Sequence, residues 1–115
     1  MPLDSTMPDP QDYIKKLFKD TANAKAELHF KLRFQPEAVR GPTKVFIRTF
    51  SRLYENTYPG LIKTMSLEDR NKKKDILDSV KRVVEDPQGE INLVQWIKAY
   101  NTYIELLVDN KMLPS

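Results

Sequence analysis

The chain has 115 residues, of which 40% are hydrophobic, enough for one globular domain without disulfides or metals. Cysteine is absent, which excludes disulfide frameworks, thiolate metal sites and cysteine nucleophiles. The net charge of +3 combines 19 basic with 16 acidic residues, and the basic excess lies in residues 25–52, which carry seven basic and two acidic side chains.

Targeting and membrane signals are missing from the sequence. No apolar run approaches the length of a membrane span, and the opening "MPLDSTMPDP" lacks the basic and apolar parts of a secretory signal. We therefore expect an intracellular protein, cytoplasmic or nuclear, that has no membrane partner. Residues 1–8 contain two prolines and no periodicity, which predicts a disordered tail before a single helical domain over residues 9–112.

The first predicted helix begins at "DPQDYIKKLF". Asp9 suits the N-cap and Pro10 the first helical position. The helical spacing of apolar residues extends to about Phe34, and the weakly apolar middle "TANAKA" leaves open a break there. Pro36 closes the element. Residues 35–42, "QPEAVRGP", are predicted to form a loop.

The second predicted helix opens at Pro42. Its apolar stripe falls within about 120° of arc, as in a helix that packs one face on a core. The members of this stripe are Phe46, Ile47, Phe50, Leu53 and Tyr54. The "TYPG" segment predicts its end, because Pro59-Gly60 suits a type II turn.

The third predicted helix begins at "SLED", with Ser66 as N-cap and Asp69 as its partner. Its first half, "EDRNKKKD", has no apolar residue and is expected to project past the core into water. The second half carries the apolar stripe of Ile76, Leu77, Val80, Val83 and Val84.

The last predicted helix follows the breaker "EDPQGEIN", with Asn92 and Gln95 as a cap pair and Asn110 as its end. It has the clearest stripe in the chain, formed by Leu93, Trp96, Ile97, Tyr100, Tyr103, Ile104, Leu107 and Val108. No segment shows the alternation of a strand. The predicted fold class is therefore all-α, a compact bundle of about four helices joined by short loops.

Catalytic constellations are not found in the sequence. The single histidine, His29, lies beside Phe30 among core-spaced residues, so we expect it to be structural. Three glycines cannot form a phosphate-cradling loop, and no metal-ligand spacing occurs. We predict a protein that is not an enzyme, with no catalytic residue, no metal and no cofactor.

A basic row on the second helix is the strongest functional signal. Lys44, Arg48 and Arg52 lie within about 80° of arc opposite the apolar stripe, about 6 Å apart along the axis. That separation is comparable with the spacing of phosphates along a nucleic-acid strand. Arg33 and Arg40 lead into the row. Glu55 argues against a binding surface, because it lies on the same arc and can pair with Arg52 or Arg48.

The lysine run on the third helix is weaker evidence. Lys72, Lys73 and Lys74 stand among Glu68, Asp69, Asp75 and Asp78, so charge pairs cancel much of their field. A plain solvated face is the favoured interpretation. As binding residues they would widen the footprint of the basic row.

Two functions remain open at this point. The first is phosphate-backbone binding to nucleic acid, DNA or RNA, without sequence specificity. The alternative is a protein-interaction, assembly or adaptor module that meets an acidic protein surface, or a partner through Tyr103 and Leu106. The feature that distinguishes these two functions is whether the basic row stays free of acidic neighbours in the folded structure.

Overall fold

The computed structural model describes residues 10–34, 37–85 and 93–112. Within these ranges the chain forms helices and no strand, which confirms the all-α prediction. The helices are α1 (Pro10–Lys31), α2 (Glu37–Thr64), α3 (Leu67–Lys72), α4 (Lys74–Glu85) and α5 (Leu93–Asp109). The predicted tail, the predicted helix end at Pro36 and the cap residue Asn92 lie outside the described residues.

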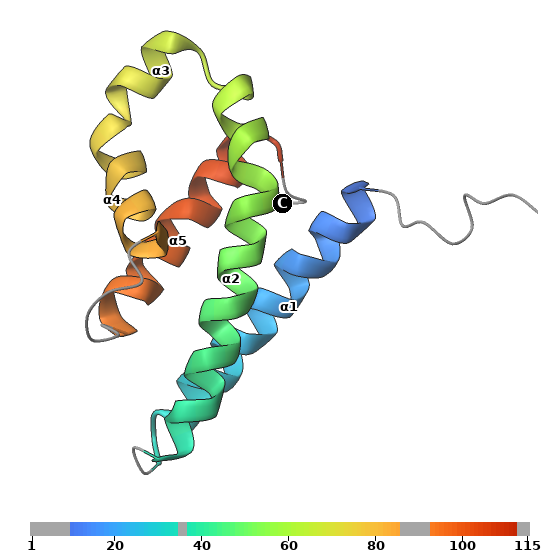
Figure 1. Cartoon of the computed structure of the whole chain (residues 1–115), viewed down its shortest axis with the longest axis vertical. Coiled ribbons are helices and arrows are strands. Elements are labelled where there is room, and N and C mark those ends of the chain that lie inside the picture. Colours follow the sequence, from blue (N-terminus) through green and yellow to red (C-terminus); the bar gives the residue numbers. More distant parts are fainter. Residues whose placement is uncertain (1–9, 35–36, 86–92, 113–115) are drawn as a thin grey trace, which may run out of the picture.

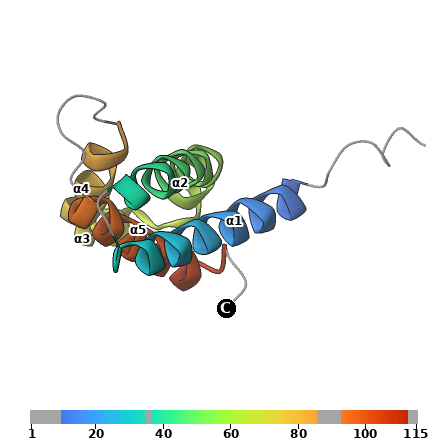
Figure 2. The same cartoon turned by 90° about the horizontal axis from the view of Figure 1, so that it is seen from below.

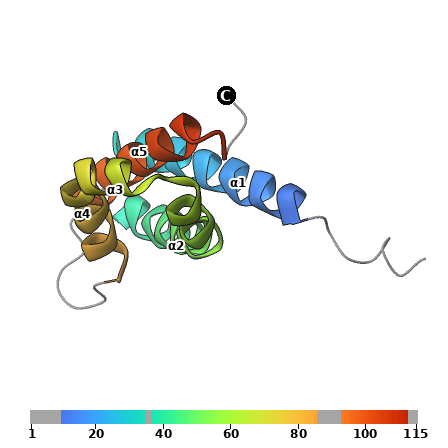
Figure 3. The same ribbon diagram turned by 90° about the horizontal axis from the view of Figure 1, so that it is seen from above.

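The helices form two layers built on a long hairpin. Helices α1 and α2 run antiparallel and pack along each other, and their joined ends lie at the bottom of Figure 1. Helix α3 follows the far end of α2, and α4 returns to pack against α5. Figures 2 and 3, seen from the two ends, place α2 on one side and α1 with α5 on the other.

An aromatic cluster occupies the space between α2 and α5. Phe46 and Phe50 are fully buried, and each ring centroid lies 5.5 Å from that of Tyr100 in an edge-on arrangement. Trp96 is partly buried and meets Phe50 edge-on at 6.0 Å. The apolar stripe predicted for α2 therefore faces the core.

Helix α1 is continuous through "TANAKA", so the break left open by the sequence does not occur. Thr21 and Ala24 are both buried, and small side chains there allow α1 to lie close to α2. The Thr21 hydroxyl is satisfied because it donates to the Leu17 carbonyl at 2.6 Å. The helix ends at Lys31, and the Phe34 amide donates to the Lys31 carbonyl in the turn that follows.

Helix α2 corrects the predicted boundaries at both ends. It begins at Glu37 rather than Pro42, and it continues through Pro59-Gly60 to Thr64. The type II turn is wrong because Leu61 and Met65 continue the buried stripe. Burying each is worth about 2 kcal/mol, which together exceeds the cost of about 3 kcal/mol for an interior proline.

The predicted third helix is two helices with a break at Lys73. The Ser66 cap is confirmed, since its hydroxyl accepts from the Asp69 amide at 3.1 Å. Helix α3 has no buried residue, as expected for a projecting segment. Because no core contact holds α3 in line with α4, the chain can turn at Lys73 and direct Leu77 and Val80 inward.

Helix α5 is buried over a wider arc than its apolar stripe predicts. Tyr103 is fully buried and Leu106 is 4% exposed, so the exposure expected of these two residues as a partner surface is wrong. The physical reason is that α5 packs against both α4 and α2. The Asn110 side chain donates to the Leu106 carbonyl at 2.8 Å just after the helix ends.

Candidate functional site

The α2 basic row consists of Arg40, Lys44, Arg48 and Arg52, all exposed. The sequence placed Arg40 in a loop, but the early start of α2 brings it into the same four-residue spacing. The row spans about 18 Å at 1.5 Å per residue. The structure therefore extends the predicted row by one arginine.

The core positions this row. Phe46, Phe50 and Leu53 are fully buried on the opposite side of α2, so their packing fixes which face of the helix meets solvent. Opposite faces of the same helix thus supply the core contacts and the cations. A rigid element holds these charges at a regular separation.

Acidic partners are absent from the row in the part of the chain that the structure describes. No described carboxylate lies within ion-pair distance of the four cations, and exposed Glu55 makes no ion pair with Arg52 or Arg48. In the same ranges, the ion pair that does form joins the Lys72 Nζ to a Glu68 carboxylate oxygen at 3.4 Å on α3. The four cations of the row are therefore not held in ion pairs by the described carboxylates.

Arg33 lies in the turn after α1 and is exposed. That turn and the start of α2 form the same end of the hairpin (Figure 1). Arg33 therefore stands at the Arg40 end of the α2 basic row, as the sequence suggested.

The lysine run does not widen this footprint. Lys72 ends α3, Lys73 is partly buried at the break, and exposed Lys74 begins α4. Helix α3 lies beyond the C-terminal end of α2. The row instead follows α2 from its N-terminal end, which adjoins the C-terminal end of α1 (Figure 1). The three lysines and the row are thus at opposite ends of the molecule.

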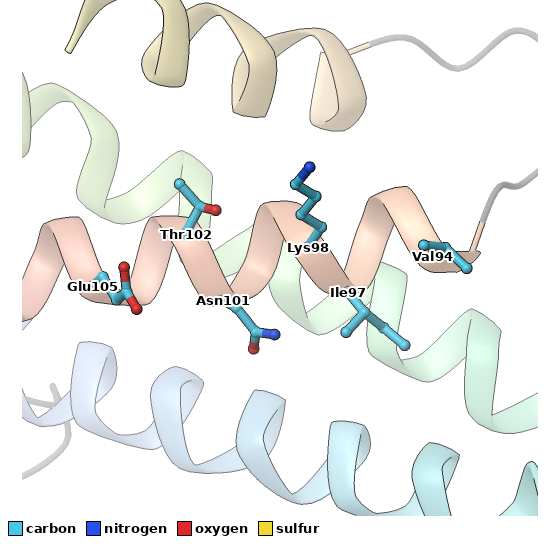
Figure 4. A pocket seen from close by; sticks show the side chains of 6 residues that line it. All are labelled: Val94, Ile97, Lys98, Asn101, Thr102 and Glu105. Carbon is cyan, nitrogen blue, oxygen red and sulfur yellow. The ribbon is translucent and has the colours of Figure 1, made fainter.

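A shallow open groove of about 390 Å³ follows the outer face of α5, between α1 and α4 (Figure 4). Lys98 and Thr102 point toward α4, whereas Asn101 points toward α1. The Lys25 ammonium of α1 donates to the Asn101 side-chain oxygen at 2.7 Å. The sequence did not predict this groove, whose lining residues all lie on α5. The lining residues are Val94, Ile97, Lys98, Asn101, Thr102 and Glu105.

Sequence reasoning missed a cluster of exposed apolar side chains after the last buried residue of α1. Phe30, Leu32 and Phe34 are 56%, 43% and 58% exposed, and we call them the apolar tip. His29 is also exposed rather than part of the core. The available signal was "HFKLRF", in which apolar and basic residues alternate once the buried stripe has ended at Leu28.

The described ranges contain neither a metal-binding cluster nor a membrane-spanning helix. No cluster of three or more histidine or carboxylate side chains there is arranged to hold a metal ion. No described helix has the length and apolarity needed to cross a bilayer.

Comparison with protein-family models, with curated proteins and with solved structures found no match to this chain.

Proposed function

We propose that this protein binds nucleic acid without catalysis, by holding backbone phosphates along the α2 basic row. The observation that supports this proposal is the exposure of four regularly spaced cations with no acidic partner in the described structure. An unpaired cation retains its full attraction for an external anion, whereas a paired one must first lose its partner.

The chemistry of the row fits phosphate. Three of its four cations are arginines, whose planar fork bonds two phosphate oxygens at once. Phosphate contacts carry affinity but no base information, so binding is expected to be similar for unrelated sequences. Arg33 extends the contact at one end of the row.

The alternative, a protein-interaction or assembly module, keeps the exposed basic row as a contact for an acidic protein surface but not the surface expected at Tyr103 and Leu106. Tyr103 and Leu106 are buried, so neither is open to a partner. The regular separation of the cations, about 6 Å for each step of four residues, supports phosphate binding over an acidic protein surface, because phosphates along a strand are spaced similarly.

A salt titration followed by fluorescence anisotropy tests the proposal. The wild-type protein should bind duplex DNA with affinity that falls steeply as salt rises. Replacing both Arg48→Gln and Arg52→Gln should lower the slope of log affinity against log salt by about 2, since each phosphate contact contributes about 0.9. The fold should survive, because both side chains are exposed.

A charge-matched control removes two cations at the other end of the molecule. The Lys72→Gln and Lys74→Gln double variant should keep the wild-type slope, because both lysines lie away from the row. Absence of binding at low salt, or one common slope for wild type and the arginine variant, would refute the proposal.

A further inference from the structure

The apolar tip differs from the other exposed apolar residues in the described chain. Large apolar side chains such as Leu67 and Val94 are exposed singly on other helices, as is normal for soluble domains. Phe30, Leu32 and Phe34 instead fall within five consecutive residues, and each is more than 40% exposed. A concentrated apolar patch on a surface marks a contact with another apolar phase.

The apolar tip is a projection from the surface rather than a groove in it. The rings of Phe30 and Phe34 contact each other, with centroids 5.3 Å apart and planes inclined by 58°. Leu32 adds a branched aliphatic side chain to the same short segment. The segment lies where α1 gives way to α2, at an end of the hairpin that projects below α4 and α5 in Figure 1.

Basic residues flank the apolar tip along the chain, and we call Lys31, Arg33, Arg40 and Lys44 its basic collar. Lys31 and Arg33 alternate with the three apolar residues of the tip. Arg40 and Lys44 follow in the first turns of α2. Residues 31–44 therefore carry four basic side chains against one acidic side chain, Glu37, a net charge of +3. An apolar projection with a basic collar is complementary to a surface that is anionic outside and apolar within.

We propose that the apolar tip docks this protein peripherally onto an anionic lipid bilayer. The side chains of Phe30, Leu32 and Phe34 enter the boundary between headgroups and acyl chains, while Lys31 and Arg33 contact headgroup phosphates and carboxylates. Apolar insertion and attraction to anionic lipid are the two contributions that peripheral binding combines. The expectation of no membrane partner rested on the lack of a spanning segment, which has no bearing on docking of this kind.

The geometry favours lipid over nucleic-acid bases at this place. Successive bases stack on aromatic faces, but the two rings here are tilted by 58° to each other and Leu32 has no ring. The proposal goes beyond nucleic-acid binding and does not depend on it: Arg33, Arg40 and Lys44 lie near both surfaces, but Phe30, Leu32 and Phe34 take no part in phosphate binding and Arg48 and Arg52 take no part in docking.

Sedimentation of the full chain with vesicles tests the proposal. The protein should bind vesicles of equal parts phosphatidylcholine and phosphatidylserine, and bind phosphatidylcholine vesicles weakly. The F30S/F34S variant should lose about tenfold or more in affinity, because two half-exposed phenylalanines no longer enter the bilayer. The F30L/F34L variant should stay within about threefold of wild type, since it keeps the apolar surface.

Two controls separate the tip from general effects. Leu67→Ser removes an apolar residue that is 66% exposed at the start of α3, away from the apolar tip, and should leave vesicle binding unchanged. Arg33→Glu reverses one charge of the basic collar and should weaken binding to the anionic vesicles. This variant still tests the proposal if F30S/F34S fails to fold, as shown by loss of its helical circular dichroism.

Three outcomes would overturn the proposal. One is equal binding to the two kinds of vesicle, and another is wild-type affinity in both F30S/F34S and Arg33→Glu. The third is loss of single-stranded oligonucleotide binding in both F30S/F34S and F30L/F34L without any vesicle binding by the wild type. That third result would assign the rings to base stacking.

Discussion

One buried hydrogen bond joins the two layers of the bundle. The Thr57 hydroxyl donates to the Leu53 carbonyl at 2.6 Å and has no second proton. The Tyr103 hydroxyl, 2.7 Å away, is therefore the donor in the bond between them. Thr57 is 1% exposed and Tyr103 is fully buried, so water cannot replace either partner.

Removing the acceptor of this bond should destabilise the protein. Thr57→Val keeps the shape but leaves the Tyr103 hydroxyl buried and unpaired, which should lower the free energy of unfolding by about 1–3 kcal/mol. The added change Tyr103→Phe should then cost less than it does in wild type, because the orphaned hydroxyl is removed. Urea melts of the two single variants and the double variant measure this coupling, and strictly additive losses would contradict the bond.

At the scale of the element, α2 shows how a buried stripe overrides a local turn signal. Pro59 has no amide proton, so the Glu55 carbonyl lacks its normal helical donor. Both residues are exposed, and water can therefore satisfy that carbonyl. Leu61, two residues beyond the proline, is fully buried and holds the last turn of α2 on the core.

Replacing this proline should strengthen the protein. Pro59→Ala restores an amide donor to the Glu55 carbonyl and should raise the free energy of unfolding by about 1–3 kcal/mol, after allowing for the greater freedom of the unfolded chain. A type II turn at this site would give the opposite sign, because proline favours such a turn. A thermal or urea melt that shows destabilisation would therefore disprove the continuous helix.

At the scale of the whole molecule, three buried tyrosines couple the packing of α2 and α5 to alkaline pH. Burial raises the pKa of Tyr54, Tyr100 and Tyr103 above the usual value of about 10. In Tyr54, the charges of Tyr58 and Glu85 raise the pKa further. The tyrosines of the unfolded chain therefore lose their protons first as the pH rises.

The pH dependence of stability follows from this order. The contribution of these tyrosines is fully present below about pH 10 and is lost as the pH rises toward their folded-state pKa values. Tyr54→Phe should weaken this decline and leave stability near pH 7 unchanged or slightly higher, because the Tyr54 hydroxyl is buried without a hydrogen-bond partner in the described structure.

Urea unfolding at several values between neutral and alkaline pH measures the effect. Tyr13→Phe is the control, because Tyr13 is 39% exposed and should leave the curve unchanged. An identical alkaline decline in wild type and Tyr54→Phe would contradict the role of burial.

Much of the fold follows from local rules that a sequence carries. Apolar spacing near 3.6 residues requires helices, and it put Phe46 and Phe50 on the buried face of α2. The Ser66 cap depends on a hydroxyl and an amide three residues apart, so it too was predictable. Exposure of Arg48 and Arg52 followed because they lie opposite that buried face.

Other features depend on segments that are distant in the sequence. Leu106 lies outside the stripe of α5 but is buried, because α4 and α2 pack on different sides of this helix. Arg40 joins the α2 basic row only because the helix begins before Pro42. Phe30 and Phe34 have the same apolar character as the core phenylalanines, yet they are exposed because the chain turns away before a neighbouring helix covers them. A residue's own chemistry sets its preference for burial, but the position of its neighbours sets whether burial takes place.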